Sequence, residues 1–185
     1  MILTFINETI SIILAYQIHN NAPAYHIYQP IQYFLISLVF YKLLGENKFY
    51  KLYFYISLIL FISFWIINLC FLQTLYTFPS NSFLLCAVFL LPQILLLFVR
   101  MLNRPENTPL KLQPIFWFST GNLVFQSTTF LIWGFQNILF ENGSRMPIFI
   151  SISLLAINFF YYGFLLMTLY AEKESQSSDS KYILT

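Results

Sequence analysis

The chain has 185 residues, of which 58% are hydrophobic, 21% aromatic and only 9% charged. A soluble domain carries about 25% charged residues to cover its surface, so this composition excludes an ordinary water-soluble globule and indicates that most side chains face lipid. The formal net charge of +2 is too small to indicate a nucleic-acid partner.

Apolar segments of about 20 residues, the length at which a helix crosses a bilayer, predict six spans. The first covers residues 1–17 and is interrupted by Asn7 and Glu8. The second covers residues 27–44 and follows a polar stretch, 20–26, which we expect to be a turn outside the cytoplasm. Because Pro23 and Pro30 restrict helix growth, we expect the regular second helix to begin near residue 30.

The remaining spans are expected at residues 52–76, 83–102, 115–139 and 148–170. The segments between them are rich in Gly, Pro, Asn and Ser, which favour turns. The tail, residues 172–185, is rich in Ser and charged residues and is expected to be disordered. The sequence therefore predicts an all-α, polytopic transmembrane bundle of six helices followed by a disordered tail.

The basic residues predict the orientation of this bundle. With six spans, eight of the nine fall on one side of the membrane: Lys42, Lys48, Lys51, Arg100, Arg104, Lys111, Lys173 and Lys181. Only Arg145 falls on the other side. Lys and Arg are enriched in cytoplasmic loops, so both termini are expected in the cytoplasm.

The fifth span carries a polar stripe. Six of its residues are separated by 3, 4, 3, 4 and 3 positions, which places them on one face of a helix: Ser119, Asn122, Gln126, Thr129, Trp133 and Gln136. Because polar groups are costly in hydrocarbon, this face should be turned inward. It either joins helices by hydrogen bonds or lines a ligand or water cavity. Asn158, Tyr161 and Tyr162 in the sixth span and Asn68 in the third could complete such an interior.

Pro92 in the fourth span removes one backbone hydrogen bond and is expected to open a kink. The adjacent Gln93 either reaches the freed carbonyl or forms a hydrogen bond to another helix.

Glu8 is the only acid within a predicted span, where a carboxyl must be protonated or hydrogen-bonded by Asn, Gln or Tyr. It is either functional or a structural residue near the cytoplasmic interface. His26 is expected at the outer lip of the second span, either as a pH-responsive group or as a satisfied interfacial residue. His19 and His26 are separated by Pro23, and Cys70 and Cys86 are dispersed, so neither a metal site nor a cofactor is expected.

Two short segments carry a family resemblance. The run from Asn21 to Tyr33 resembles an "N-x-P-L-Y-H-I-Y" turn in multi-pass membrane proteins of Bacteroidota for which no activity is established. The run Phe116-Trp117-Phe118 resembles the "FW" segment of the same proteins. Gln32 stands where their pattern has an acid. The resemblance implies a helical bundle in a bacterial inner membrane, of the accessory or sensor type.

Three function classes follow. The first is a non-enzymatic sensor or accessory subunit that binds a small molecule or lipid, with membrane lipids and a partner membrane protein or second copy as its contacts. Its candidate ligand-binding residues are Glu8, His26, Gln32, Asn122, Gln126, Thr129, Asn158 and Tyr161. The second is a small transporter or channel. The third is an intramembrane enzyme acting on lipid with Glu8 or His26 as acid or base, which requires the two groups to lie close together.

Overall fold

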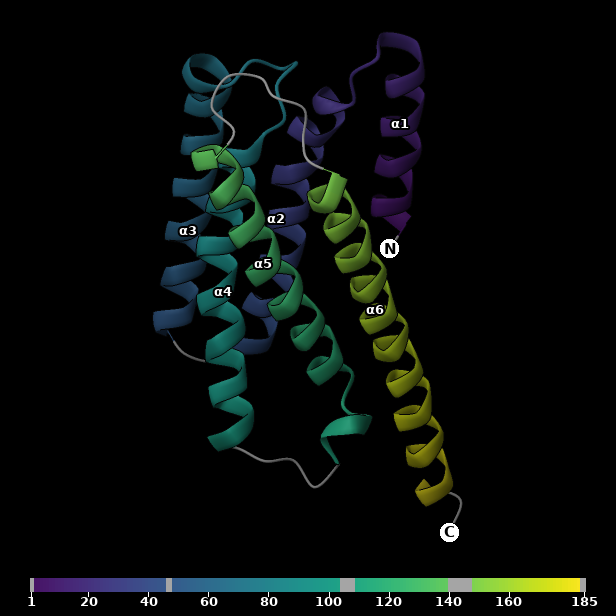
Figure 1. The fold of residues 1–185 in the computed structure, drawn as a ribbon. Helices are drawn as coiled ribbons and strands as arrows, with labels where there is room; N and C mark the ends of the chain where they lie inside the picture. Colours follow the sequence, from purple (N-terminus) through teal and green to yellow (C-terminus); the bar gives the residue numbers. More distant parts are fainter. Residues whose placement is uncertain (1, 46–47, 104–108, 140–147, 184–185) are drawn as a thin grey trace.

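The computed structural model describes residues 2–45, 48–103, 109–139 and 148–183. The described residues form six α-helices and no strand: α1 (Ile2–Ile18), α2 (Ala22–Leu44), α3 (Lys48–Ile67), α4 (Ser80–Asn103), α5 (Pro114–Leu139) and α6 (Ile148–Ile183). Successive helices run in opposite directions along the bundle (Figure 1). The predicted all-helical fold is confirmed.

Three segments are long and apolar enough to cross a membrane by length and composition: residues 48–72, 80–103 and 152–174. The outer surface carries large apolar side chains that a water-soluble surface does not expose in such numbers. Phe71 is 83% exposed, Phe159 is 78% exposed and Leu155 is 73% exposed. The structure thus supports a membrane protein.

Helix α2 begins earlier than the sequence predicts. It starts at Ala22 and continues through Pro30. Pro23 lies in the first turn, where its missing N–H removes no helical hydrogen bond, and the side-chain carbonyl of Asn20 accepts the N–H of Ala22 at 2.8 Å. His19 directly follows α1 and has a left-handed backbone conformation, with φ 53°. Five of the seven residues expected as a turn, Ala22 to His26, are therefore helical.

The third span is predicted to continue to residue 76, but its helix ends earlier. Helix α3 gives way at Asn68 to a π-helical turn (Asn68–Leu72), and Gln73 is extended. The Asn68 side chain is fully buried. It donates to Gln73 Oε1 at 2.9 Å and accepts from Asn81 Nδ2 at 3.1 Å. These amide contacts fix the turn that leads from α3 to α4.

Helix α6 is longer than predicted, because the helical backbone continues to Ile183 instead of ending at residue 170. The segment from 172, expected to be disordered, is thus helical over most of its length. Its first residues, Glu172-Lys173-Glu174, are good helix formers, and no Gly or Pro follows Gly163 to interrupt the helix.

The core of the bundle is formed by α2, α3 and α4, around the fully buried Tyr33, Phe40, Phe61 and Leu90. Helix α5 packs on α4, α6 packs on α5, and α1 packs on α2. The side chains of Ser37 in α2 and Gln93 in α4 are hydrogen-bonded at 2.9 to 3.0 Å. Gln93 therefore joins two helices by hydrogen bonds and does not form one to the carbonyl freed by Pro92.

The described basic residues lie at one end of the bundle. The α2–α3 and α4–α5 junctions meet there, and the C-terminal end of α6 points the same way (Figure 1). Arg100, in the last turn of α4, donates to the backbone carbonyl of Leu43 at the end of α2. A cation at this position also complements the α2 helix dipole. Arg104 and Arg145 lie outside the described residues.

Candidate functional site

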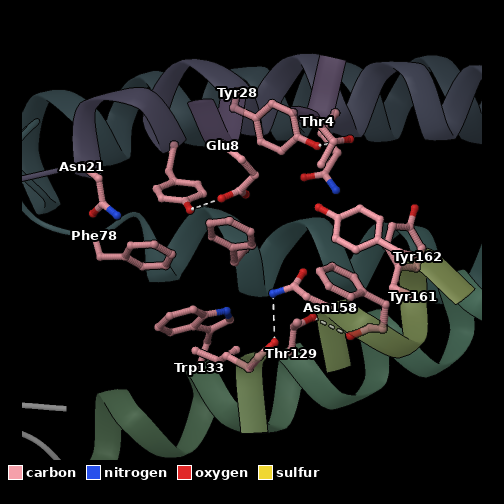
Figure 2. Close-up of a pocket in the computed structure, with 15 residues that line it drawn as sticks. Thr4, Glu8, Asn21, Tyr28, Phe78, Thr129, Trp133, Asn158, Tyr161 and Tyr162 are labelled. Atoms are coloured by element: carbon pink, nitrogen blue, oxygen red, sulfur yellow. Dashed lines mark hydrogen bonds between the residues drawn. The ribbon is translucent and has the colours of Figure 1, made fainter. Parts of the chain in front are cut away.

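A cavity of about 360 Å³ lies between α1 and α2 on one side and α5 and α6 on the other. Its lining residues are Thr4, Glu8, Asn21, Tyr25, Tyr28, Gln32, Phe78, Phe83, Phe125, Thr129, Trp133, Leu154, Asn158, Tyr161 and Tyr162. In Figure 2 Asn21, Phe78 and Trp133 lie at one end of the cavity and Tyr161 and Tyr162 at the other. The volume is in the range of small-molecule sites.

Helix α1 contributes a polar face to the cavity. Thr4 and Glu8 are four residues apart and line it, while Asn7 and Ser11, on the same side of the helix, are buried. The opposite side of α1 is apolar, with Ile6 and Ile13 both exposed. Glu8 is half-buried, so its carboxyl is presented to the interior and not to the surrounding lipid.

Helix α2 supplies Tyr25, Tyr28 and Gln32, spaced 3 and 4 residues apart. The Tyr25 hydroxyl donates to Glu8 Oε2 at 3.4 Å, and the Tyr28 hydroxyl donates to Thr4 Oγ1 at 3.0 Å (Figure 2). These two bonds hold α1 against α2. They also orient the Glu8 carboxyl toward the cavity.

Four aromatic rings gather at one end of the cavity. Phe78 stacks on Trp133 of α5 with centroids 4.3 Å apart, and on Phe83 of α4 at 5.2 Å. Tyr25 meets Phe78 at 5.4 Å. Phe78 is placed there because the preceding loop is tied to the start of α2, where Thr77 O accepts from His26 Nε2 at 2.9 Å.

The far wall comes from α5 and α6. Phe125 and Tyr161 pack at 4.7 Å, and the Tyr161 hydroxyl points to Asn122 Oδ1 at 3.5 Å. Asn158 lines the cavity and donates to the Leu154 carbonyl of its own helix. This bond uses one N–H of Nδ2, so the side-chain carbonyl of Asn158 stays available to accept from a ligand.

Five of the eight predicted site residues line this cavity: Glu8, Gln32, Thr129, Asn158 and Tyr161. Three do not. Asn122 and Gln126 are buried beside it, and Asn122 Nδ2 donates to the Phe118 carbonyl. His26 was expected at an exposed lip, but it is only 1% exposed. It is held by Thr77, and its own carbonyl accepts the Trp65 indole N–H at 3.0 Å.

The polar stripe of α5 is buried at Ser119, Asn122, Gln126, Thr129 and Trp133, as its spacing predicts. The stripe has two parts. Thr129 and Trp133 line the cavity, whereas the stripe residues nearer the start of α5 pack between helices. Outside the lining, Asn122 Oδ1 accepts from Tyr161 Oη of α6 at 3.5 Å, whereas Ser119 Oγ is buried with no hydrogen-bond partner among the described residues. The Gln136 side chain lies outside the described residues.

Sequence reasoning missed several lining residues, including Thr4, Tyr25, Tyr28, Phe78 and Phe83. A signal existed for some of them. Thr4, Asn7, Glu8 and Ser11 follow helical spacing, as do Tyr25, Tyr28 and Gln32. Tyrosines near the end of a span are also typical interfacial anchors, so their spacing alone does not identify a cavity lining. Phe78 carries no such signal, because it lies in a turn and is positioned only by tertiary contacts.

The lining holds one carboxyl, four tyrosine hydroxyls and three side-chain amides, and no Lys, Arg or His contributes to it among the described residues. No group of three or more His, Cys, Asp and Glu side chains is gathered in the described part of the chain. Glu8 lines the cavity and His26 does not, so the acid–base pair that a lipid-acting enzyme requires is not assembled by these two residues.

No protein-family model, curated protein or solved structure matches this chain. The resemblance to membrane proteins of Bacteroidota therefore stays a prediction.

Proposed function

We propose that this chain is a non-enzymatic, multi-pass protein of a bacterial inner membrane that binds a small molecule or lipid inside its helical bundle, as a sensor or an accessory subunit. The observation that carries the proposal is the cavity, which combines stacked aromatic rings with convergent polar groups. Sites of this kind, largely apolar with a few fixed polar groups, are typical of small-molecule binding.

Three segments are apolar enough to cross a membrane by length and composition. The positions of the polar residues in α2 and α5 support a larger number, six. His26 and Gln29 of α2 and Asn122 of α5 are at most 1% exposed. The outward residues of the same helices are apolar, including Ile31 and Leu131. A helix with a polar inner face has a lower average hydropathy and can still cross a membrane, because only its outer face meets lipid.

The gathering of basic residues at one end of the bundle supports a cytoplasmic location for that end. Asn21 and Phe78, which line the cavity, lie at the α1–α2 and α3–α4 junctions, at the opposite end (Figure 1). In this orientation the cavity lies toward the outer side of the membrane. A ligand would reach it from the side of the membrane opposite the cytoplasm or from the outer leaflet.

The test is to fill the cavity and measure retained ligand. Leu154 of α6 lines the cavity, whereas its neighbour Leu155 is 73% exposed on the outer face. Native mass spectrometry of the purified protein should show a bound molecule in the wild type and in Leu155→Trp, and lose it in Leu154→Trp. Equal retention by both variants, or no bound molecule in any of the three, would contradict the proposal.

A further inference from the structure

The charge of the cavity indicates the chemistry of its ligand. Among the described lining residues, Glu8 is the only ionisable group of low intrinsic pKa, and no described Lys, Arg or His side chain reaches the cavity. In the described part of the chain its hydrogen-bond partner is the neutral Tyr25 Oη, at 3.4 Å. A half-buried carboxyl without a cationic partner is costly in low dielectric, so a cation brought by the ligand would lower the free energy of the complex.

The aromatic rings favour the same ligand. Eight of the lining side chains are aromatic: Tyr25, Tyr28, Phe78, Phe83, Phe125, Trp133, Tyr161 and Tyr162. The negative faces of such rings attract ammonium groups, most strongly when the cation has left water. The rings therefore provide both an apolar wall for a hydrocarbon portion and an attractive surface for a positive charge.

Two further polar side chains of the lining, Asn158 and Gln32, can complete the contact. The bond from Asn158 to the Leu154 carbonyl uses Nδ2 and leaves the Asn158 side-chain carbonyl available. Gln32 also lines the cavity. Carbonyl oxygens accept the N–H groups of a primary ammonium, which has three donors and no acceptor. An anionic ligand would find no positive side chain here and would be repelled by Glu8.

We infer that the cavity binds an organic cation, a primary or quaternary amine attached to an apolar group, with the ammonium between Glu8 and the tyrosine rings and the apolar part against Phe78 and Trp133. The inference rests on the proposed function, since it requires that the cavity is a binding site. The ammonium can belong to a free amine or to the headgroup of a lipid such as phosphatidylethanolamine.

The first experiment compares isosteres on the wild-type protein in neutral detergent. Isothermal titration calorimetry is carried out with 2-phenylethylamine, with 2-phenylethanol as its neutral isostere, and with 3-phenylpropanoate as the anion. Choline and 3,3-dimethylbutan-1-ol form a second cation and neutral pair. We expect each cation to bind at least about tenfold more tightly than its neutral isostere, and the anion more weakly than either.

The second experiment removes the charge. Glu8→Gln keeps the size of the side chain, so it should abolish most of the preference for the amine while 2-phenylethanol binds as before. The matched control is Glu172→Gln, which changes an exposed acid on α6 outside the cavity and should preserve the preference. If Glu8→Gln does not fold, the wild-type isostere comparison alone decides the inference.

A lipid arm separates the two sources of the ammonium. The protein is reconstituted in mixed phosphatidylethanolamine and phosphatidylglycerol, and its retained lipids are analysed by native mass spectrometry. Retained phosphatidylethanolamine that 2-phenylethylamine displaces assigns a headgroup, whereas binding of the free amine without lipid retention assigns a soluble ligand.

Two results would overturn the inference, and they differ in what else they overturn. Neutral isosteres that bind as tightly as the amines refute the choice of a cation and leave the proposed binding function in place. If no probe binds and no lipid is retained, the proposed function fails as well.

Discussion

The hydroxyl of Tyr25 donates to the carboxyl of Glu8 at 3.4 Å, and this bond joins α1 to α2 beside the cavity. Removing it with Tyr25→Phe should lower stability by about 0.5 kcal/mol, the lower end for a hydrogen bond, because the distance is long. Thermal unfolding in detergent of Tyr25→Phe, Glu8→Ala and the double variant gives the coupling between them. Tyr16→Phe, on the exposed side of α1, is the control and should be neutral. Strict additivity of the first two changes would show that the bond contributes nothing.

The tight approach of α5 to α6 gives a second prediction. A Cβ added at Gly121 would lie 2.6 Å from Cβ of Phe164, whereas a Cβ at Gly163 would meet nothing within 4 Å. Gly121→Ala should therefore force the helices apart and destabilise the protein by about 1–3 kcal/mol. Gly163→Ala should be neutral or stabilising by up to about 1 kcal/mol, since Ala has the higher helix propensity. Melting temperatures measured side by side test both, and equal values for the two variants would contradict this packing.

The buried pair Ser37 and Gln93 gives a third prediction, because removing one partner should cost more stability than replacing both. Ser37→Ala leaves the Gln93 amide buried without its hydroxyl partner, which should cost about 1–3 kcal/mol. Adding Gln93→Met replaces that amide by an apolar side chain of similar shape and should recover most of the loss. The measurement is unfolding of the single and double variants. A double variant less stable than Ser37→Ala would be inconsistent with a bond that acts only between these two residues.

Orientation gives a fourth prediction, tested by cysteine labelling in intact cells. In a Cys70→Ser, Cys86→Ser background, Lys48→Cys and Lys111→Cys should be labelled only after the cytoplasmic side is exposed, because both lie at the basic end of the bundle. Tyr76→Cys, 68% exposed in the α3–α4 loop, should react with an impermeant reagent from outside. Labelling of positions 48 and 111 from opposite sides would refute the six-span topology.

The helices could be predicted from the sequence because lipid selects long apolar runs, and α4 and α5 fall within three residues of their expected bounds. Their ends were harder to predict. The π-helical turn at Asn68 depends on its contacts with Gln73 and Asn81, which are tertiary and leave no periodic trace. The early start of α2 was missed because Pro23 was interpreted as a barrier, although in a first turn it is compatible with a helix.

The site residues that could be predicted from the sequence are mainly those that recur at helical spacing. The α5 stripe was found because five of its polar residues recur at helical spacing over a long apolar background. The α1 face is predicted only in part: Glu8 is a candidate because an acid within a span is unusual, whereas Thr4, one turn before it, gives no such signal by itself. The exposure of His26 was predicted wrongly, since no pattern in the sequence shows that the loop containing Thr77 folds over it.

The walls of the cavity come from both ends of the polypeptide, α1 and α2 first and α5 and α6 last. During synthesis the N-terminal helices emerge first. Glu8 and its neighbouring polar groups are therefore made before the helices that cover them. Any chain stopped before α6 would carry an acid and an amide-rich α5 face into the bilayer without their cover, and membrane quality control would have a clear feature by which to recognise it.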